Sequence, residues 1–214
     1  DIDPYKSSSF IGYSLWMVPC GNSKSVYSKL ISDTSSDLGT FEFLPHITLV
    51  AAMLKGEEDT VQRAKALAAE LAPFTFEFED ISYRDAYFQC VYARLKRTDA
   101  VIHANDVARI FFPERQADPT YTPHLSLVYG DFDEETKRNQ IVPKLEKADD
   151  YDSPMTFLPV DAIEVWSTQG DVKEWYKVET IPLTRKVESK SLSSKKVSKQ
   201  PQQTTLHYEI ISRQ

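Results

Sequence analysis

The chain has 214 residues, of which 41% are hydrophobic and 27% charged, and its formal net charge is −7. These values are typical of one globular domain or two small lobes packed together, and no apolar run reaches the length of about 18 residues that a membrane span needs. No basic stripe precedes residue 184, which disfavours a protein that grips a long polynucleotide along its phosphates. A nucleotide ligand would therefore be small, and we expect a monomer.

Helical spacing and strand alternation predict a mixture of the two element types in chain order. The predicted elements are strand 11–18, helix 24–38, strand 43–51, helix 57–72, strand 74–79, strand 86–95, helix 99–112, strand 122–129, helix 133–147, strand 155–167 and strand 172–182. Thr98 is the expected cap of the helix at 99–112, and Pro143 should kink or divide the helix at 133–147. The inward side chains expected in the helix at 99–112 are Val101, Ile102, Val107, Ile110 and Phe111.

This order lacks the regular βαβ rhythm of a parallel sheet. It favours an α+β fold of two similar lobes, with largely antiparallel sheets facing a central cleft and helices on the outside. We expect a flexible arm at 1–10, the folded domain at 11–183, and a linker and tail rich in Ser, Lys and Gln at 184–214. The last ten residues would add a strand or remain a tail. Because the chain begins at Asp1 rather than Met, we expect a fragment or a processed form.

One short motif occurs twice, once in each half of the chain. It is Pro-His-Ile-Thr-Leu-Val at residues 45–50 and Pro-His-Leu-Ser-Leu-Val at 123–128. Side chains two apart on a strand share a face, so His46 lies beside Thr48, and His124 beside Ser126. Each copy thus offers an imidazole and a hydroxyl on one face, while aliphatic residues anchor the other face.

Two such pairs can divide acid–base chemistry between them. A neutral imidazole takes a proton near neutral pH and a charged one gives it, while the hydroxyls donate hydrogen bonds to phosphate oxygens. No metal or other cofactor is required for this. The histidines at 103 and 207 have no such motif and are expected to be structural or exposed.

Other kinds of site fit less well. A zinc centre needs three or four ligands, and neither the histidines nor Cys20 and Cys90 have such spacing. No Gly-x-Ser-x-Gly elbow marks a serine nucleophile. For the two cysteines, buried free thiols fit better than a disulfide, although the disulfide stays open as an alternative.

The paired motifs resemble those of the two-histidine (2H) phosphoesterase superfamily. The stretch Thr-Pro-His-Leu-Ser-Leu-Val-Tyr-Gly at 122–130, with Tyr-Ser-Leu-Trp at 13–16 and Pro19, is most similar to the cyclic phosphodiesterases of plants and fungi. The likeness spans residues 11–182. It implies a bilobal α+β fold, with His46 and His124 as catalytic residues and Thr48 and Ser126 as their hydroxyl partners.

The resemblance also implies a function. The family hydrolyses ADP-ribose 1″,2″-cyclic phosphate, a by-product of tRNA splicing, and nucleoside 2′,3′-cyclic phosphates, which open to 2′-phosphates. The resemblance implies that His124 is the base, a role that the residues alone leave open. It also implies that Tyr129 lies near the substrate. Strict alternation points Tyr129 away from His124, so that role needs a bend at residues 129–130.

Two alternatives stay open: a related enzyme acting on RNA ends, and a non-catalytic nucleotide-binding module. By default we expect a soluble cytoplasmic protein, although fungal relatives are associated with the Golgi apparatus.

Overall fold

The computed structural model describes residues 9–115, 121–148 and 156–185. Its strands are β1 (Ser9–Phe10), β2 (Tyr13–Met17), β3 (Ile47–Met53), β4 (Phe74–Tyr83), β5 (Val91–Leu95), β6 (His124–Val128), β7 (Phe157–Val160), β8 (Ala162–Ser167), β9 (Gly170–Asp171) and β10 (Tyr176–Pro182). The helices are α1 (Gly21–Leu38), α2 (Glu57–Glu70), α3 (Asp99–Phe111), α4 (Glu134–Thr136) and α5 (Val142–Ala148), with short 3₁₀ turns η1 (Tyr87–Gln89), η2 (Pro113–Arg115) and η4 (Val172–Glu174) and the π-helical turn η3 (Lys137–Ile141).

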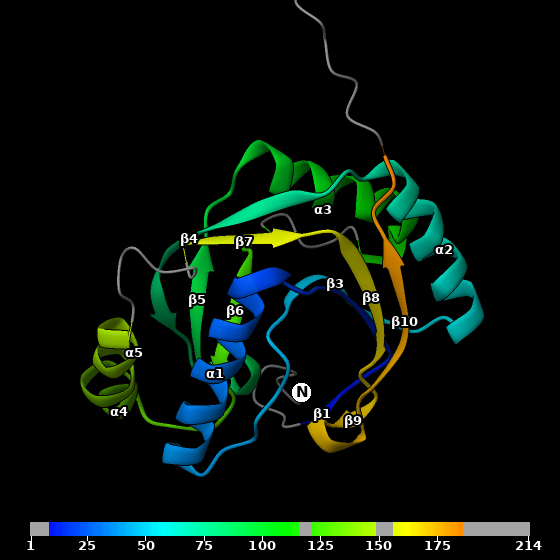
Figure 1. The fold of residues 1–214 in the computed structure, drawn as a ribbon. Coiled ribbons are helices and arrows are strands. Elements are labelled where there is room, and N and C mark those ends of the chain that lie inside the picture. The colour runs from blue at the N-terminus through cyan, green and yellow to red at the C-terminus, as the bar shows by residue number, and fades with distance from the viewer. Residues whose placement is uncertain (1–8, 116–120, 149–155, 186–214) are drawn as a thin grey trace, which may run out of the picture.

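The main sheet has eight strands in the order β10-β8-β2-β3-β6-β5-β4-β7, and every pair in it is antiparallel. The strand predicted at 155–167 is divided at Asp161: β7 before it pairs with β4, and β8 after it pairs with β2. A single residue thus connects strands near the opposite ends of the sheet. The sheet must therefore curl round on itself, as Figure 1 shows.

Two lobes meet at the middle of this sheet. The first contains β10, β8, β2 and β3, and the second contains β6, β5, β4 and β7. They join where Ile47 of β3 pairs with Leu125 of β6. The expected α+β architecture of two antiparallel lobes is confirmed.

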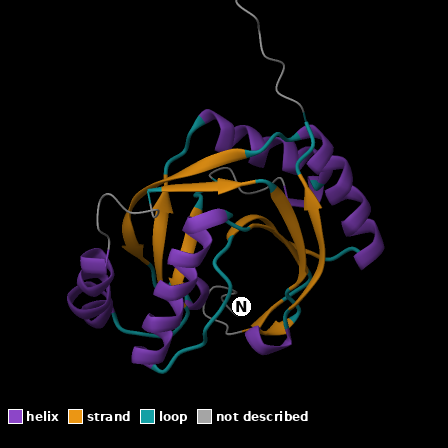
Figure 2. Ribbon diagram, in the orientation of Figure 1, coloured by secondary structure: helices purple, strands orange, loops and turns teal. Residues whose placement is uncertain are grey.

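The helices cover the sheet, and two of them tie the lobes together. α1 connects β2 to β3 in the first lobe but packs on β6 and β7 of the second. α3 connects β5 to β6 and packs on β3 of the first lobe, where the buried Asn105 side chain donates to the Leu49 carbonyl (2.9 Å). Figure 2 shows α2 and α3 on the outside of the curled sheet.

Two local details, at Ile110 and Thr98, differ from the sequence-based expectations. Ile110 was expected to face inward but is 71% exposed, because α3 buries the small residues Ala104 and Ala108 against its neighbours instead. Thr98 precedes α3 as expected, yet its side chain caps nothing and its hydroxyl is buried without a partner. The helix predicted at 133–147 is divided near Pro143 as expected, because the π turn η3 ends at Ile141 and α5 begins at Val142.

Residues near the two ends of the described chain are held more closely than expected. Ser9 and Phe10, predicted to belong to a flexible arm, pair with Asp171 and Gly170. The N–H groups of Thr184 and Arg185 donate to carbonyls at the end of α2. Residues 1–8 and 186–214, with His207 and the predicted C-terminal strand or tail, lie outside the described residues.

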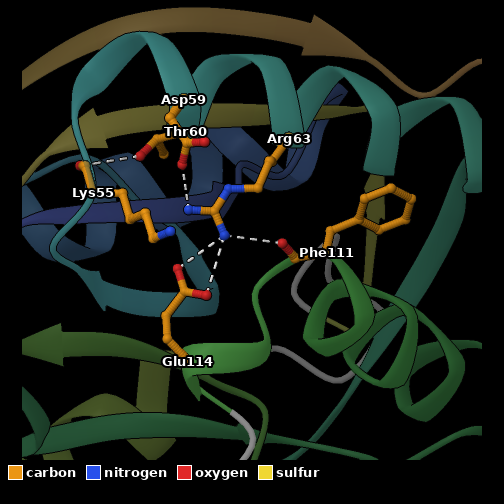
Figure 3. Close-up of polar contacts among 6 residues, drawn as sticks. All are labelled: Lys55, Asp59, Thr60, Arg63, Phe111 and Glu114. Atoms are coloured by element: carbon orange, nitrogen blue, oxygen red, sulfur yellow. Dashed lines mark hydrogen bonds and ion pairs between the residues drawn. The ribbon is translucent and has the colours of Figure 1, made fainter.

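Arg63 on α2 connects three elements of the fold (Figure 3). Its guanidinium pairs with Asp59 one turn earlier, bonds both carboxylate oxygens of Glu114 in η2 (3.0 and 3.1 Å), and donates to the Phe111 carbonyl at the end of α3 (3.1 Å). It also lies 4.7 Å from the centre of the Phe112 ring. These contacts fix the end of α3 against α2.

Candidate active site

The two motifs lie side by side where the lobes join. His46 directly precedes β3, and His124 is the first residue of β6. Because Ile47 pairs with Leu125 in an antiparallel register, His46 comes opposite Ser126, and Thr48 opposite His124. Side chains paired in this way are on the order of 5 Å apart at Cβ and share a face. The structure thus brings together the four motif side chains that the sequence singled out.

Each imidazole is oriented by a carbonyl two residues before it. His46 Nδ1 lies 2.7 Å from the Leu44 carbonyl oxygen, and His124 Nδ1 lies 2.9 Å from that of Thr122. A carbonyl oxygen can only accept, so both Nδ1 atoms carry the proton. In the neutral form the Nε2 atom of each ring is therefore left with a lone pair that can accept a proton.

Burial keeps both histidines neutral in the free protein. His46 is 6% exposed, and loss of hydration lowers its pKa to about 4, with a smaller lowering from the nearby His124. Burial also lowers the pKa of the half-buried His124, as does the positive charge of Arg84, while the bond to Thr122 opposes this. A positive charge on His124 therefore disfavours one on His46.

The hydroxyl residues of the motifs have different surroundings. Ser126 Oγ donates to the Phe88 carbonyl at 2.7 Å, so its proton is occupied in the free protein. The backbone carbonyl of Thr48 accepts a bond from the Tyr121 hydroxyl at 2.9 Å. That bond ties the segment before the second motif to the strand of the first.

Tyr129 reaches the face of the histidines because β6 contains a bulge. Tyr92 pairs with Ser126 but Val91 pairs with Val128, so Leu127 is an extra residue that shifts the alternation by one. The Tyr129 hydroxyl lies 3.4 Å from His46 Nε2, to which it donates, and burial raises its pKa. The change of direction that this role needs is thus present, at Leu127 rather than at residues 129–130.

Aromatic rings cover the site, and sequence reasoning did not place them there. Trp16 stacks on His46 with ring centres 3.6 Å apart, Phe43 stacks on Tyr129 at 3.7 Å, and Tyr92 meets His124 edge-on at 5.3 Å. Trp16 belongs to the Tyr-Ser-Leu-Trp stretch at 13–16 that resembles the family, and this resemblance was the only sequence feature that pointed to it. The site in the free protein is therefore closely packed around His46.

The sequence also singled out two cysteines and a third histidine. Cys20 and Cys90 are free thiols, and His103 is exposed on α3. No three His, Cys, Asp or Glu side chains among the described residues gather as ligands for a metal ion. Within the described part of the chain, none of the helices has the length and apolarity to cross a membrane.

The fold and the paired motifs place the chain in the 2H phosphoesterase class. The model of the cyclic phosphodiesterase-like protein family matches residues 11–183, and the chain belongs to that family. The family predicted from the motifs is confirmed.

Two curated relatives support this assignment. A cyclic phosphodiesterase of Arabidopsis thaliana is 29% identical over 127 residues, which are 59% of this chain and 70% of the relative. A 2′,3′-cyclic-nucleotide 3′-phosphodiesterase of Phaeosphaeria nodorum is 30% identical over 135 residues, 56% of this chain and 69% of the relative.

Solved structures with low sequence identity share the fold. A Thermus thermophilus protein matches with a TM-score of 0.56 at 13% identity, over 82% of this chain and 99% of its own. LigT of E. coli complexed with 3′-AMP matches with a TM-score of 0.54 at 11% identity, over 83% of this chain and 100% of its own.

Proposed function

We propose that this protein hydrolyses small cyclic phosphates without a metal ion. The substrates are nucleoside 2′,3′-cyclic phosphates, which open to 2′-phosphates, and ADP-ribose 1″,2″-cyclic phosphate, the by-product of tRNA splicing. Membership of the cyclic phosphodiesterase-like family and the names of the two relatives support the reaction class. The observation that carries the proposal is the pairing of Ile47 with Leu125, which sets both imidazoles on one face. Bonds from each Nδ1–H to a backbone carbonyl leave both Nε2 atoms available for proton transfer.

The reaction needs one base and one acid on opposite sides of the phosphorus. His124 Nε2 takes a proton from water as the water oxygen bonds to phosphorus, and the bond from phosphorus to the ribose 3′ oxygen breaks. His46 gives its Nε2 proton to that oxygen, which leaves a 2′-phosphate and a 3′-hydroxyl. Proton exchange with solvent then restores the starting state of both rings.

Substrate binding supplies the charge state that the reaction requires. Both imidazoles are neutral in the free protein because burial lowers their pKa. The negative phosphate raises the pKa of an imidazole beside it, so that the acid becomes protonated only in the complex. Displaced water also strengthens every charge interaction within the site.

Two side chains must change partners when substrate enters. The Tyr129 hydroxyl leaves His46 Nε2, where its bond is long at 3.4 Å, and donates to a phosphate oxygen. Ser126 Oγ rotates from the Phe88 carbonyl to another phosphate oxygen, joined by the Thr48 hydroxyl. Each donor placed where negative charge develops lowers the barrier by about 3 kcal/mol.

The experiment is an assay of the purified chain against ADP-ribose 1″,2″-cyclic phosphate and the four nucleoside 2′,3′-cyclic phosphates, with products assigned by ³¹P NMR. We expect 2′-phosphates from the nucleotides and full activity in EDTA. Formation of 3′-phosphates, or activity lost in EDTA and restored by zinc, would contradict the mechanism. Binding without turnover of any substrate would indicate a nucleotide-binding module instead, and steeply salt-dependent binding of RNA would favour an enzyme of RNA ends.

A further inference from the structure

A stack of three rings consists of the His46 imidazole and the indoles of Trp16 and Trp166, with His46 at one end. The Trp16 indole lies 3.6 Å from the imidazole, nearly parallel at 13°, and 4.5 Å from the Trp166 indole, at 27°. The register explains the order, because Trp16 on β2 pairs with Thr48 on one side and with Glu164 of β8 on the other. The Trp16 ring is therefore held between His46 and Trp166.

A buried carboxylate holds the far end of this stack. Glu164 is 6% exposed, and its Oε2 accepts a bond from Trp166 Nε1 at 2.8 Å. Its Oε1 accepts from Lys177 Nζ at 3.2 Å, across the β8–β10 pair. Burying a carboxylate is unfavourable unless it is paired, and here Lys177 and the Trp166 N–H each bond one of its two oxygens.

We infer that Glu164 is a positioning residue for the cyclic-phosphate reaction, acting on His46 through Trp166 and Trp16. The inference rests on the proposed function. The bond from His46 Nδ1 to the Leu44 carbonyl fixes one direction of the ring. In the proposed mechanism the Tyr129 hydroxyl leaves Nε2 when substrate enters, so these two bonds do not fix the ring plane in the complex. Contact with the Trp16 face fixes the plane, and hence the direction of Nε2. Trp166, locked by Glu164, keeps Trp16 in that contact.

Three variants test this chain of contacts separately. Trp166→Phe keeps a ring but removes the N–H, Glu164→Ala removes the acceptor, and Glu164→Gln keeps an oxygen that can accept from Trp166. We expect kcat to fall roughly tenfold in the first two with KM nearly unchanged, since the misplaced ring affects proton transfer more than binding. Glu164→Gln should recover most of the lost kcat.

Proton NMR of the imidazoles gives a readout independent of activity. The stacked indole shields the ring protons of His46, so Trp166→Phe and Glu164→Ala should shift the His46 signals and leave those of His124 in place. Glu179→Gln is the matched control: Glu179 lies on the same strand pair but bonds Lys65 of α2 at 2.9 Å, and its loss should change neither readout.

Several results would overturn the inference. They are an unchanged kcat in folded Trp166→Phe, a rise in KM alone, and His46 signals that stay in place in that variant. Because Trp166→Phe changes few atoms, it remains informative even where Glu164→Ala does not fold. If the wild type turns over no cyclic phosphate, the proposed function fails, whereas the NMR shift still tests the stack.

Discussion

Ile47 of β3 lies directly opposite Leu125 of β6, and both side chains are fully buried. This pair joins the lobes and also decides which side chains share the other face of the strands. A shift of one residue in the register would turn His124 and Ser126 away from His46. The core contact and the candidate catalytic face therefore depend on the same pairing.

Replacing either motif histidine should abolish turnover. We expect His46→Ala and His124→Ala each to lower kcat by about 10²- to 10⁴-fold, because each removes one proton-transfer group. Circular dichroism should show that both still fold, and His46→Gln keeps more of the buried volume if the alanine variant is unstable. His103→Ala, an exposed histidine on α3, is the control and should have wild-type rates. A motif variant with a near-normal rate would remove that residue from the mechanism.

The acid and base roles can be separated with a changed leaving atom. A nucleoside 2′,3′-cyclic phosphorothiolate with sulfur at the 3′ position leaves as a thiolate, which needs no proton. If His46 is the acid, the loss of rate in His46→Ala should be much smaller with this substrate, while the loss in His124→Ala should persist. Steady-state rates of the two variants on both substrates provide the measurement. Rescue of His124→Ala instead would reverse the assignment.

Stability should depend on pH through His46. Burial lowers its pKa to about 4, from the ordinary 6.5, so the unfolded chain takes up this proton before the folded protein does. The contribution of the neutral ring is complete above pH 6.5 and is lost as pH falls towards 4, by about 3 kcal/mol.

Urea unfolding of the wild type and His46→Gln at several pH values measures this contribution. The free energy of unfolding of the wild type should fall relative to that of the variant between pH 6.5 and 4. Groups common to both proteins cancel in the difference. A difference that stays constant with pH would show that His46 is not held neutral.

Arg63 should contribute to stability rather than to chemistry. Arg63→Met keeps much of the side-chain volume but leaves the Phe111 carbonyl and Glu114 without their donor (Figure 3). We expect a loss of about 1–3 kcal/mol in the free energy of unfolding, with KM nearly unchanged. Lys29→Met, at an exposed ion pair with Asp33 on α1, should lose less than about 1 kcal/mol. Equal losses in the two variants would contradict the role given to Arg63.

Sequence alone was sufficient for the motifs and most elements because these depend on local pattern. The alternation at 45–50 and 123–128 correctly set His46 beside Thr48, and His124 beside Ser126. It could not place Tyr129, because the bulge at Leu127 is defined only by pairing with β5. The failure at Ile110 has a similar origin, since the buried stripe of α3 is chosen by what packs against it.

The aromatic cover of the site also escaped sequence analysis. Trp16 and Trp166 are distant in the chain and meet only because β2 pairs with β8. Likewise, the division of the predicted strand 155–167 at Asp161 reflects two pairing partners in different lobes. Such features are set by long-range topology, which no local window contains.

The most direct test of the central claim is a crystal structure with a nucleoside 2′,3′-vanadate, which mimics the five-coordinate phosphorus. The account predicts one Nε2 within about 2.6–3.2 Å of the oxygen in the position of the attacking water, and the other within the same distance of the ribose 3′ oxygen. Tyr129 should have moved from His46 to the vanadate. A complex in which either His46 or His124 does not contact the vanadate or the ribose oxygen would contradict the account.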